Sequence, residues 1–359
     1  MKILILANSD MGLYKFRKEL LEVFKEKKYE VYVSFPHGNM QQEIELLTDK
    51  IIYTDIDRRG TNVIKDFFLL IKYIFLIKKI NPDFVLTYTI KPNLYGGIAS
   101  AINKKPFIMN ITGLGSAFLK TGLVKKIIIN LYKFVLPNSK CVFFQNSFDQ
   151  DSILKLKLKL NNYKLLPGSG VNLKEYSYME YPPSDDVIKI LFIGRIIKEK
   201  GIEELIEAIK IIKQKRKNIQ IDVVGPCDIA YRKKITSWVD EGLIVYHGLQ
   251  KNVKPFYKAS HVLVNPSYSE GMSNVCLEAG ASGRPIIVSK IPGCLEIFDE
   301  NISGFGFTSG NVGEMVIALE KFISIDYNEK KNMGLMLRKK IESNFSREII
   351  IRKYLDEMG

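Results

Sequence analysis

Residues 261–279 read HVLVNPSYSEGMSNVCLEA, and this stretch decides the fold. The apolar run His261–Val264 predicts a strand, and Ser273 or Asn274 begins a helix that is rich in Leu and Ala. A buried strand that leads through a loop into a helix is typical of a parallel sheet. Free backbone N–H groups at the start of the helix, reinforced by its dipole, form an anion site that suits a diphosphate.

Two carboxylates accompany this predicted anion site. Glu270 precedes the helix, where its oxygens can accept hydrogen bonds from hydroxyl groups, and Glu278 lies about one turn further on. The pair therefore suits a ligand that carries both diols and phosphate. For one carboxylate alone, a capping loop with a surface glutamate is the favoured explanation.

A second basic segment supports this interpretation. The strand Ile190–Ile193 ends in Gly194, and Arg195 and Lys200 then emerge where both can reach a common anion. Arginine gives forked contacts to phosphate and lysine gives point-like ones, while Gly201 permits a tight turn into the next helix. A solvated basic turn is the alternative for this segment taken by itself.

Short apolar runs alternate with helical patterns along the whole chain, which predicts parallel sheets covered on both faces. The alternation restarts after Tyr176–Asp186, whose adjacent prolines and acids indicate a linker. Each half is then a doubly wound α/β domain with its ligand crevice at the carboxyl ends of its strands. The expected strands are Lys2–Ala7, Glu30–Phe35, Ile51–Tyr53, Phe84–Thr87, Phe107–Ile111, Cys141–Gln145, Ile188–Ile193, Ile219–Val224, Leu243–Tyr246, His261–Val264 and Ile286–Ser289.

Composition agrees with a folded protein of two domains. The 359 residues are 46% hydrophobic and 26% charged, which excludes a disordered chain. The net charge is +14, of which +11 lies in residues 1–180.

The four cysteines are isolated and predict buried, reduced thiols. The start of the chain lacks the pattern of a signal peptide. A cytoplasmic protein is expected.

The two phosphate-site elements together resemble the retaining glycosyltransferases of family 4, which have the GT-B fold. The matching pieces are Glu270 and Glu278 with seven residues between them, and the segment Gly194–Gly201 before them. The glycine loop Ser9–Gly12 also fits, as do Gly168–Asn172 with Tyr176 and the helix after Ser346.

The resemblance implies an α/β chain with two doubly wound Rossmann-like domains that face each other across a cleft. Residues 1–175 would bind the acceptor, residues 176–343 would bind the nucleotide sugar, and residues 344–359 would form a helix that returns to the first domain. Within the family, the bacterial capsule and lipid-linked oligosaccharide branch is the most similar. The motifs that carry this likeness are Arg59–Asn62, Lys91–Asn93, Thr112–Ser116 and Pro292–Glu296.

The resemblance also implies the roles of individual residues. Arg195, Lys200 and Glu270 are the expected catalytic residues, of which the first two hold the diphosphate, and Glu278 holds the ribose. The residues expected to bind the donor are Gly12, Gly194, Gly271, Met272, Ser273, Asn274, Val275, Glu278, His247, Gly248 and Leu249. Those expected to position the sugar or the acceptor are Thr89, Lys91, Asn93, Gly113 and Gly115. Many family members carry a His after the fourth strand, where this chain has Thr89 and Lys91.

A metal site is not expected. Asp55-Ile56-Asp57 matches the DxD motif of the other glycosyltransferase fold, but the architecture predicted here is the wrong one for it. The three histidines have no ligand spacing. No cofactor is expected, and the resemblance implies a UDP-sugar as the donor substrate.

Two lysine-bearing apolar helices are candidates for contact with an anionic membrane surface. Helix Val63–Ile80 is expected to pack in the core instead, because Pro82 and a strand follow it directly. For Leu123–Phe134, membrane contact and core packing explain the sequence equally well. No nucleic-acid motif accompanies the basic charge.

The sequence therefore predicts a retaining, metal-independent glycosyltransferase on the inner face of the cell membrane. It would move a hexose or N-acetylhexosamine from a UDP-sugar to a polyprenyl-diphosphate-linked saccharide. Two alternatives stay open: a UDP-sugar 2-epimerase of the same fold, which needs no acceptor, and a non-catalytic basic module that docks on a membrane or nucleic acid.

Overall fold

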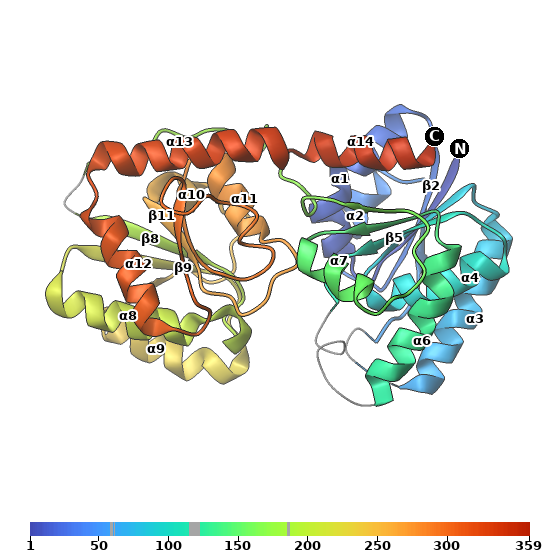
Figure 1. Cartoon of the computed structure of the whole chain (residues 1–359), viewed down its shortest axis with the longest axis horizontal. Helices are drawn as coiled ribbons and strands as arrows, with labels where there is room; N and C mark the ends of the chain where they lie inside the picture. The colour runs from blue at the N-terminus through green and yellow to red at the C-terminus, as the bar shows by residue number, and fades with distance from the viewer. Residues whose placement is uncertain (58–59, 61, 115–122, 185–186) are drawn as a thin grey trace. The chain divides into compact units, whose positions relative to one another are not determined.

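The computed structural model of the chain describes residues 1–57, 60, 62–114, 123–184 and 187–359. The chain forms two compact units (Figure 1). The first unit comprises Met1–Ser169 and Ile350–Gly359, and the second comprises Gly170–Ile349. Each division of the chain lies a few residues from the domain limits expected at residues 175 and 343.

The first unit is built on a seven-stranded sheet in which every neighbouring pair of strands is parallel. Its order is β3-β2-β1-β4-β5-β6-β7, so the direction of winding reverses between β1 and β4. The strands are β1 (Lys2–Leu6), β2 (Glu30–Phe35), β3 (Lys50–Tyr53), β4 (Phe84–Tyr88), β5 (Phe107–Ile111), β6 (Cys141–Phe144) and β7 (Tyr163–Leu165).

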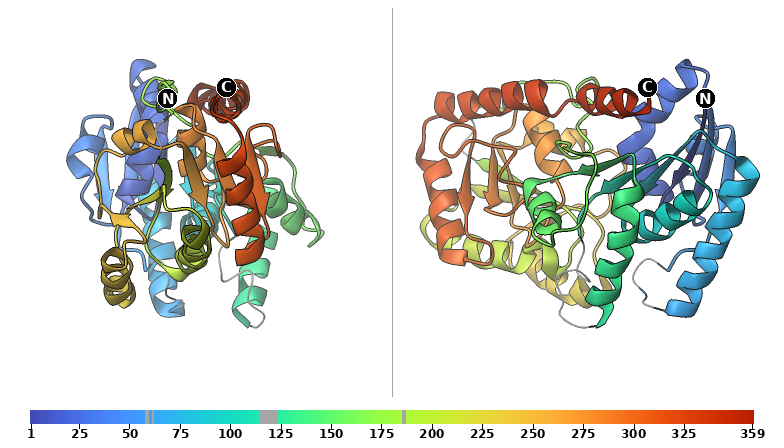
Figure 2. Two further views of the ribbon diagram at one scale, coloured as in Figure 1. Left: turned by 90° about the vertical axis from the view of Figure 1, so that its left-hand side faces the viewer. Right: turned by 45° about the vertical axis from the view of Figure 1, so that its right-hand side comes forward.

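Helices cover both faces of this sheet (Figures 1 and 2). Successive residues of β1 face opposite layers: Ile3 and Ile5 pack with α1 and α14, and Leu4 and Leu6 pack with α3, α4 and α6. The helices are α1 (Asp10–Glu26), α2 (Gln41–Glu45), α3 (Val63–Ile80), the π-helical turn η1 (Pro92–Gly96), α4 (Gly97–Ile102), α6 (Leu123–Asn138), α7 (Ser147–Leu154) and α14 (Arg347–Met358).

The end of the chain completes the core of the first unit. Tyr354 on α14 is fully buried, its hydroxyl donates to Asn110 Oδ1, and its ring meets Phe143 edge-on at 4.9 Å between centroids. The guanidinium of Arg17 on α1 lies 4.7 Å from the ring centroid of Tyr88 on β4. The last helix is therefore an integral part of the first unit.

The second unit repeats the architecture with a six-stranded parallel sheet in the order β10-β9-β8-β11-β12-β13. Its strands are β8 (Ile188–Ile193), β9 (Ile219–Val224), β10 (Val245–Tyr246), β11 (Val262–Asn265), β12 (Ile286–Ser289) and β13 (Gly304–Phe307). Its helices are η2 (Lys198–Lys200), α8 (Ile202–Lys215), η3 (Ile229–Tyr231), α9 (Arg232–Asp240), α10 (Lys254–Ala259), α11 (Asn274–Ala281), α12 (Val312–Ser324) and α13 (Tyr327–Asn344).

The segment that the sequence identifies as a linker is packed on the second unit. The Tyr181 hydroxyl donates to the backbone carbonyl of His261 at 2.9 Å. The buried guanidinium of Arg284 donates to the carbonyls of Met179 and Glu180. The linker prediction is therefore wrong for these residues, because a buried arginine needs acceptors and this extended segment supplies them. Asp185 and Asp186 lie outside the described residues.

Among the described residues, no helix has both the length and the apolar character needed to span a lipid bilayer.

Candidate active site

Two adjacent strands of the second sheet carry the residues that the sequence singles out. The winding of this sheet reverses between β8 and β11, and doubly wound sheets bind ligands outside the carboxyl ends of the strands at such a point. Gly194 and Arg195 follow β8, and Glu270 follows β11. The structure therefore places the two predicted phosphate-site segments at one switch point.

A close ion pair joins the two segments. Lys200 Nζ lies 2.6 Å from Glu270 Oε1, and the two side chains are 23% and 14% exposed. The Ser267 hydroxyl lies 2.8 Å from the same carboxylate oxygen. Arg195, by contrast, is exposed to solvent. The site thus presents one cation already paired with a carboxylate and one directed to solvent.

A buried polar network fixes the start of α11 beneath this ion pair. Asn265, at the end of β11, donates from Nδ2 to the Ser273 hydroxyl at 2.7 Å, and its Oδ1 lies 2.7 Å from the Ser267 hydroxyl. Because the Ser273 side chain is held by Asn265, it makes no capping hydrogen bond to the helix. Asn265 and Ser267 were not predicted as site residues. The feature of the sequence that could have identified them is a polar side chain directly after an apolar run that forms a strand.

The loops that follow β8 and β11 approach each other closely at Gly201. This residue has φ +66°, and a Cβ added to it would lie 2.1 Å from the carbonyl oxygen of Pro266. A side chain here would therefore push apart the two loops that carry Lys200 and Glu270.

We expect Gly201→Ala to destabilise the second unit more than Gly242→Ala. Gly242 has an equivalent φ of +67°, but no atom of the described residues lies within 4 Å of its added Cβ, so Gly242→Ala measures the cost of the backbone conformation alone. That cost is about 1 kcal/mol, whereas forcing the loops apart at Gly201 should raise the loss to roughly 2–4 kcal/mol. Chemical denaturation followed by fluorescence of Trp238, the single Trp of the chain, reports on this unit. Equal losses for the two variants would contradict the close approach.

Glu278 lies in α11 and is held by a buried tyrosine. The Tyr257 hydroxyl lies 2.9 Å from Glu278 Oε2, and Tyr257 is fully buried. Burial, followed by the charge of Glu278, raises the pKa of Tyr257 well above its ordinary value. The same two causes raise the pKa of Tyr176, whose ring packs edge-on against Tyr257. Both hydroxyls therefore remain protonated, and Tyr257 donates to the carboxylate.

The predicted nucleobase segment, His247 to Leu249, follows β10, two strands away from β8. The His247 imidazole lies 2.7 Å from Asp222 Oδ1, so the ring is held by β9. Gly248 has φ +65° and its carbonyl accepts from Gly225 N, while Leu249 is 72% exposed. The hydrogen bond from Gly225 thus fixes the backbone of Gly248, and the next side chain, Leu249, is exposed to solvent.

In the first unit, the segment after β4 has an unusual backbone. Thr89 has φ +73°, which is unfavourable for a β-branched residue, and its buried hydroxyl has no hydrogen-bond partner among the described residues. Lys91 forms an ion pair with Asp66, whose other carboxylate oxygen accepts from the Tyr95 hydroxyl at 3.0 Å. The predicted positioning residues Thr89 and Lys91 therefore both lie between β4 and η1, at the switch point of the first sheet, and Lys91 directly precedes η1.

Other residues predicted for the first unit have structural partners. Asn93 is buried. Its side-chain amide accepts a hydrogen bond from the Thr87 hydroxyl on β4 and donates one to the Asn110 carbonyl on β5, so it joins η1 to these two strands. Gly12 lies in the first turn of α1 rather than in the expected glycine loop, because Ser9 caps this helix by accepting from Gly12 N. Gly113 has φ +136°, and no atom of the described residues lies within 4 Å of a Cβ added to it. Gly115 and Arg59 lie outside the described residues.

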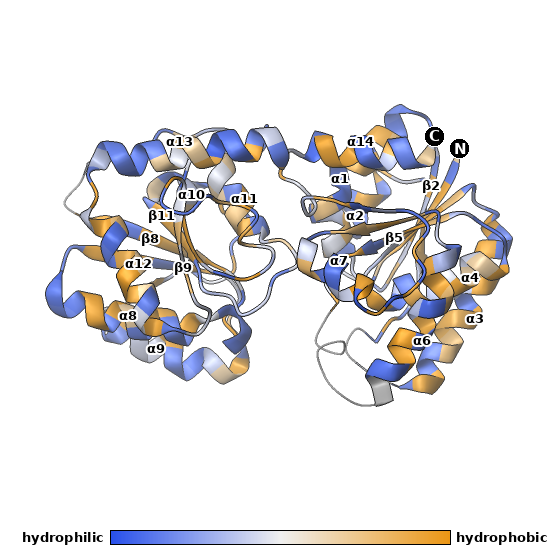
Figure 3. Ribbon diagram, in the orientation of Figure 1, coloured by the Kyte–Doolittle hydropathy of each residue, from blue (hydrophilic) through white to orange (hydrophobic). Residues whose placement is uncertain are grey.

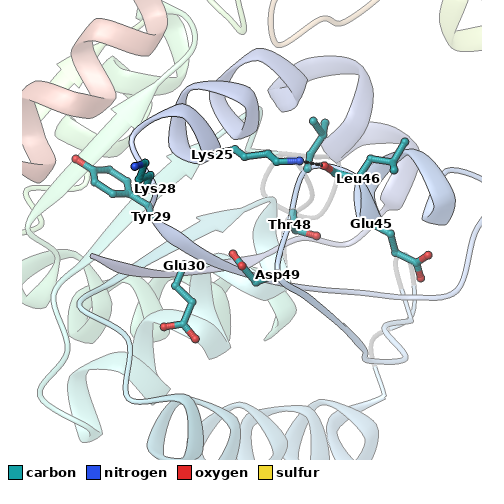
Figure 4. A pocket seen from close by; sticks show the side chains of 9 residues that line it. Lys25, Lys28, Tyr29, Glu30, Glu45, Leu46, Thr48 and Asp49 are labelled. Carbon is teal, nitrogen blue, oxygen red and sulfur yellow. Dashed lines mark hydrogen bonds between the residues drawn. The ribbon is translucent and has the colours of Figure 1, made fainter.

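One cavity of the first unit lies apart from these residues, whereas a second is lined in part by Asp66, the ion-pair partner of Lys91. One, of about 420 Å³, is lined by the residues in Figure 4, including Glu30 and Asp49. These mark the amino ends of β2 and β3, the edge of the sheet opposite to its switch point. The other, of about 680 Å³, is lined by Asp55, Asp57 and residues of α3. Within the part of the chain that the structure describes, no three His, Cys, Asp or Glu side chains are grouped as metal ligands.

Two doubly wound parallel units in one chain are the architecture of the GT-B fold. A glycosyltransferase from Rickettsia africae has the same fold, with a TM-score of 0.80 and 19% identity over 99% of this chain and 97% of that one. HepE from Anabaena, solved with UDP and glucose, matches with a TM-score of 0.79 and 16% identity over 99% of this chain and 98% of that one.

Family models place the sequence within this class. The model "Glycosyl transferases group 1" matches residues 179–340, and "Glycosyl transferase 4-like" matches residues 2–146. The chain therefore belongs to the GT4 family of glycosyltransferases.

Two curated relatives are similar along most of their length. The N,N'-diacetylbacillosaminyl-diphospho-undecaprenol alpha-1,3-N-acetylgalactosaminyltransferase of Campylobacter jejuni is 27% identical over 99% of this chain and 97% of its own. The capsular polysaccharide biosynthesis glycosyltransferase CapM of Staphylococcus aureus is 25% identical over 92% of this chain and 90% of its own. The family and the fold that the sequence predicts are thus confirmed.

Proposed function

We propose that this glycosyltransferase moves a hexose or N-acetylhexosamine from a UDP-sugar to a saccharide carried on a lipid diphosphate, for the assembly of a surface polysaccharide or glycan. The observation that carries the proposal is the meeting of Lys200, Glu270 and the start of α11 at one switch point. Cations and a helix N-terminus suit a diphosphate, and the nearby carboxylates suit the hydroxyls of a sugar and a ribose.

Donor binding would rearrange the ion pair. The diphosphate of the donor would draw Lys200 from Glu270, and Arg195 would add forked contacts to the same phosphates. Glu270 would then be free to accept hydrogen bonds from the transferred sugar. Glu278, held by Tyr257, would bind the ribose hydroxyls. The start of α11 would contact the phosphates through the backbone of residues 271–275.

The proposed reaction uses no protein nucleophile. The bond between the anomeric carbon and the phosphate oxygen breaks, and the acceptor oxygen bonds to the same face of that carbon. Because the new bond forms on the face from which the old bond breaks, the configuration is retained. The leaving phosphate oxygen takes the acceptor proton. Negative charge develops on the diphosphate, where Arg195, Lys200 and the helix N-terminus stabilise it electrostatically.

The relatives support the choice of substrates. HepE has been solved in complex with UDP and with UDP-glucose, which favours a UDP-sugar donor here. The Campylobacter relative is named for an undecaprenol-diphosphate-linked acceptor and an α-1,3 product. UDP-hexoses are α-glycosides, so an α-linked product favours retention.

A thermal-shift panel of UDP- and GDP-sugars tests the donor class. A ligand that binds only the folded state at about 100 times its Kd stabilises that state by about 2.7 kcal/mol. We expect UDP and at least one UDP-hexose or UDP-N-acetylhexosamine to raise the melting temperature, and GDP-sugars to leave it unchanged. A shift with GDP-sugars alone would contradict the proposed donor.

We expect activity to survive an excess of EDTA. In the proposed site, the leaving diphosphate is neutralised by Arg195, Lys200 and backbone N–H groups, and no step uses Asp55 or Asp57. The initial rate should change less than about twofold, within the scatter of such assays. Loss of activity in EDTA with recovery in Mg²⁺ or Mn²⁺ would overturn the metal-independent mechanism.

A further inference from the structure

Helix α3 is apolar on two opposite faces. Leu69, Tyr73 and Ile80 are buried against the sheet of the first unit. At 3.6 residues per turn, Ile64 and Phe68 project from the opposite side of the helix, where they are 69% and 66% exposed. The outer face continues through Phe75, and Val63 and Phe67 widen it at the start of the helix; these three side chains are 65%, 73% and 57% exposed. Figure 3 shows α3 as a mostly apolar ribbon that is interrupted by hydrophilic residues.

Core packing therefore explains only half of the helix. Scattered exposed apolar residues are normal in a folded protein, but five on one helix form a contiguous surface. The expectation that Val63–Ile80 is a core helix is correct for its inner face and leaves the outer face unexplained. We call the five exposed residues Val63, Ile64, Phe67, Phe68 and Phe75 the outer face of α3.

Lysines border this outer face. Lys65, Lys72 and Lys79 lie along one side of it and Lys78 along the other, and all four are exposed. The single acid of the helix, Asp66, is paired with Lys91. Two further carboxylates, Asp55 and Asp57, line a cavity together with Lys65, Phe68 and Lys72. The four lysines outnumber these two carboxylates, so the surface is apolar with an excess of positive charge, as in helices that lie in a membrane interface with lysines at the level of the headgroups.

The charge of this surface indicates which kind of partner can bind to it. If two copies of the chain met symmetrically through α3, a lysine-bearing side of one helix would face a lysine-bearing side of the other, because a two-fold interface pairs a patch with itself and lysines border this face on both sides. Like charges across an interface disfavour such a contact. A negatively charged lipid surface complements both the lysines and the apolar side chains.

Helix α6 is a weaker candidate for the same contact. Its exposed large apolar residues among those described are Ile127 and Phe134, at 44% and 48% exposure. Ile128, Tyr132 and Val135 on the same helix are buried in the core. The two helices can therefore be compared as matched elements of one unit.

We propose that the outer face of α3 is the surface by which this chain docks on an anionic lipid bilayer. The aromatic side chains enter the boundary between headgroups and acyl chains, and the lysines meet the anionic headgroups. This inference rests on the proposed lipid-linked acceptor, since docking brings the first unit to the membrane that holds such a substrate.

Vesicle sedimentation tests the proposal with three multiple variants. The α3 variant carries Phe67→Gln, Phe68→Gln and Phe75→Gln, which keep good helix propensity and change only exposed side chains. The α6 variant carries Ile127→Gln and Phe134→Gln. The control carries Ile229→Gln, Ile302→Gln and Ile317→Gln, which are exposed apolar residues of the second unit. The vesicles contain phosphatidylglycerol and phosphatidylcholine.

The α3 variant should lose about 100-fold or more in vesicle affinity, since each ring contributes roughly tenfold when it is removed from water. The α6 variant should lose less than about tenfold and the control variant nothing. Wild-type binding should weaken as salt is raised and disappear on pure phosphatidylcholine. The proposal would be overturned if the α3 variant bound vesicles as the wild type does, or if the α3 and α6 variants lost the same affinity. It would also be overturned if light scattering showed that the wild type is a dimer and that the α3 variant is not.

A second measurement separates docking from catalysis. With a water-soluble, short-chain diphosphate-linked acceptor, the α3 variant should transfer sugar at the wild-type rate. With a long-chain acceptor in vesicles, its rate should fall with its vesicle affinity. If the wild type binds vesicles through α3 but transfers sugar to neither acceptor, the proposed function fails and the docking surface stands. If the α3 variant matches the wild type on the long-chain acceptor, the docking surface fails and the function stands.

Discussion

Replacing Arg195 or Lys200 by Ala should lower the maximal rate of sugar transfer by about 10²–10³-fold. Both cations are proposed to stabilise negative charge on the leaving diphosphate, and removal of one such stabiliser from a preorganised site typically costs this much.

The comparison requires saturating donor, so that weak binding is not mistaken for slow chemistry. Lys198→Ala is the matched control: this lysine lies in the same short helix, η2, and is exposed, but it forms no part of the proposed site. Its rate should stay close to that of the wild type. Near-normal maximal rates for the Arg195 and Lys200 variants would reduce the Gly194–Gly201 segment to a structural turn.

Glu278→Ala should weaken donor binding by about 10- to 150-fold, because a lost charge-assisted hydrogen bond costs roughly 1.5–3 kcal/mol. Calorimetric titration with UDP measures this directly, since the contact is proposed to be to the ribose. Stability of the fold should change less, because the side chain of Glu278 is only partly buried.

Tyr257→Phe serves as the partner variant for this measurement. It removes the hydroxyl that lies 2.9 Å from Glu278 Oε2 but keeps the buried ring. If Tyr257 positions the carboxylate, UDP affinity should fall by about three- to tenfold, the usual worth of one hydrogen bond. Donor affinity that is unchanged in Glu278→Ala would remove this residue from the site.

The sheets could be predicted well because their strands are continuous apolar runs between helical patterns. The runs Glu30–Phe35, Phe107–Ile111, Ile188–Ile193, Ile219–Val224 and Ile286–Ser289 coincide with the observed strands. Two strands were missed for physical reasons. β7 is three residues long with two of them exposed, and β13 reads Gly-Phe-Gly-Phe, a composition that locally resembles a turn.

The candidate site could be predicted in part. The segments around Lys200 and Glu270 were identified because each follows an apolar strand, where parallel sheets bind ligands. Their ion pair could not be foreseen, since it depends on the close approach of two loops at Gly201. Asn265 and Tyr257 act from buried positions, and nothing in the local pattern distinguishes such residues from ordinary core polar groups.

The outer face of α3 shows a further limit of sequence patterns. An apolar helix followed by a proline and a strand predicts core packing, and half of α3 obeys that prediction. Whether the other half is covered depends on what packs outside the helix, which periodicity cannot reveal.

The most direct test of the proposed function is transfer of labelled sugar from a UDP-hexose or UDP-N-acetylhexosamine into a polyprenyl-diphosphate-linked saccharide. The label should enter the lipid fraction only when both donor and acceptor are present, and NMR of the product should show the anomeric configuration of the donor. Conversion of the UDP-sugar to an epimer without acceptor would instead identify an epimerase. Failure to transfer from any UDP-hexose or UDP-N-acetylhexosamine to a lipid-linked acceptor would contradict the proposed reaction.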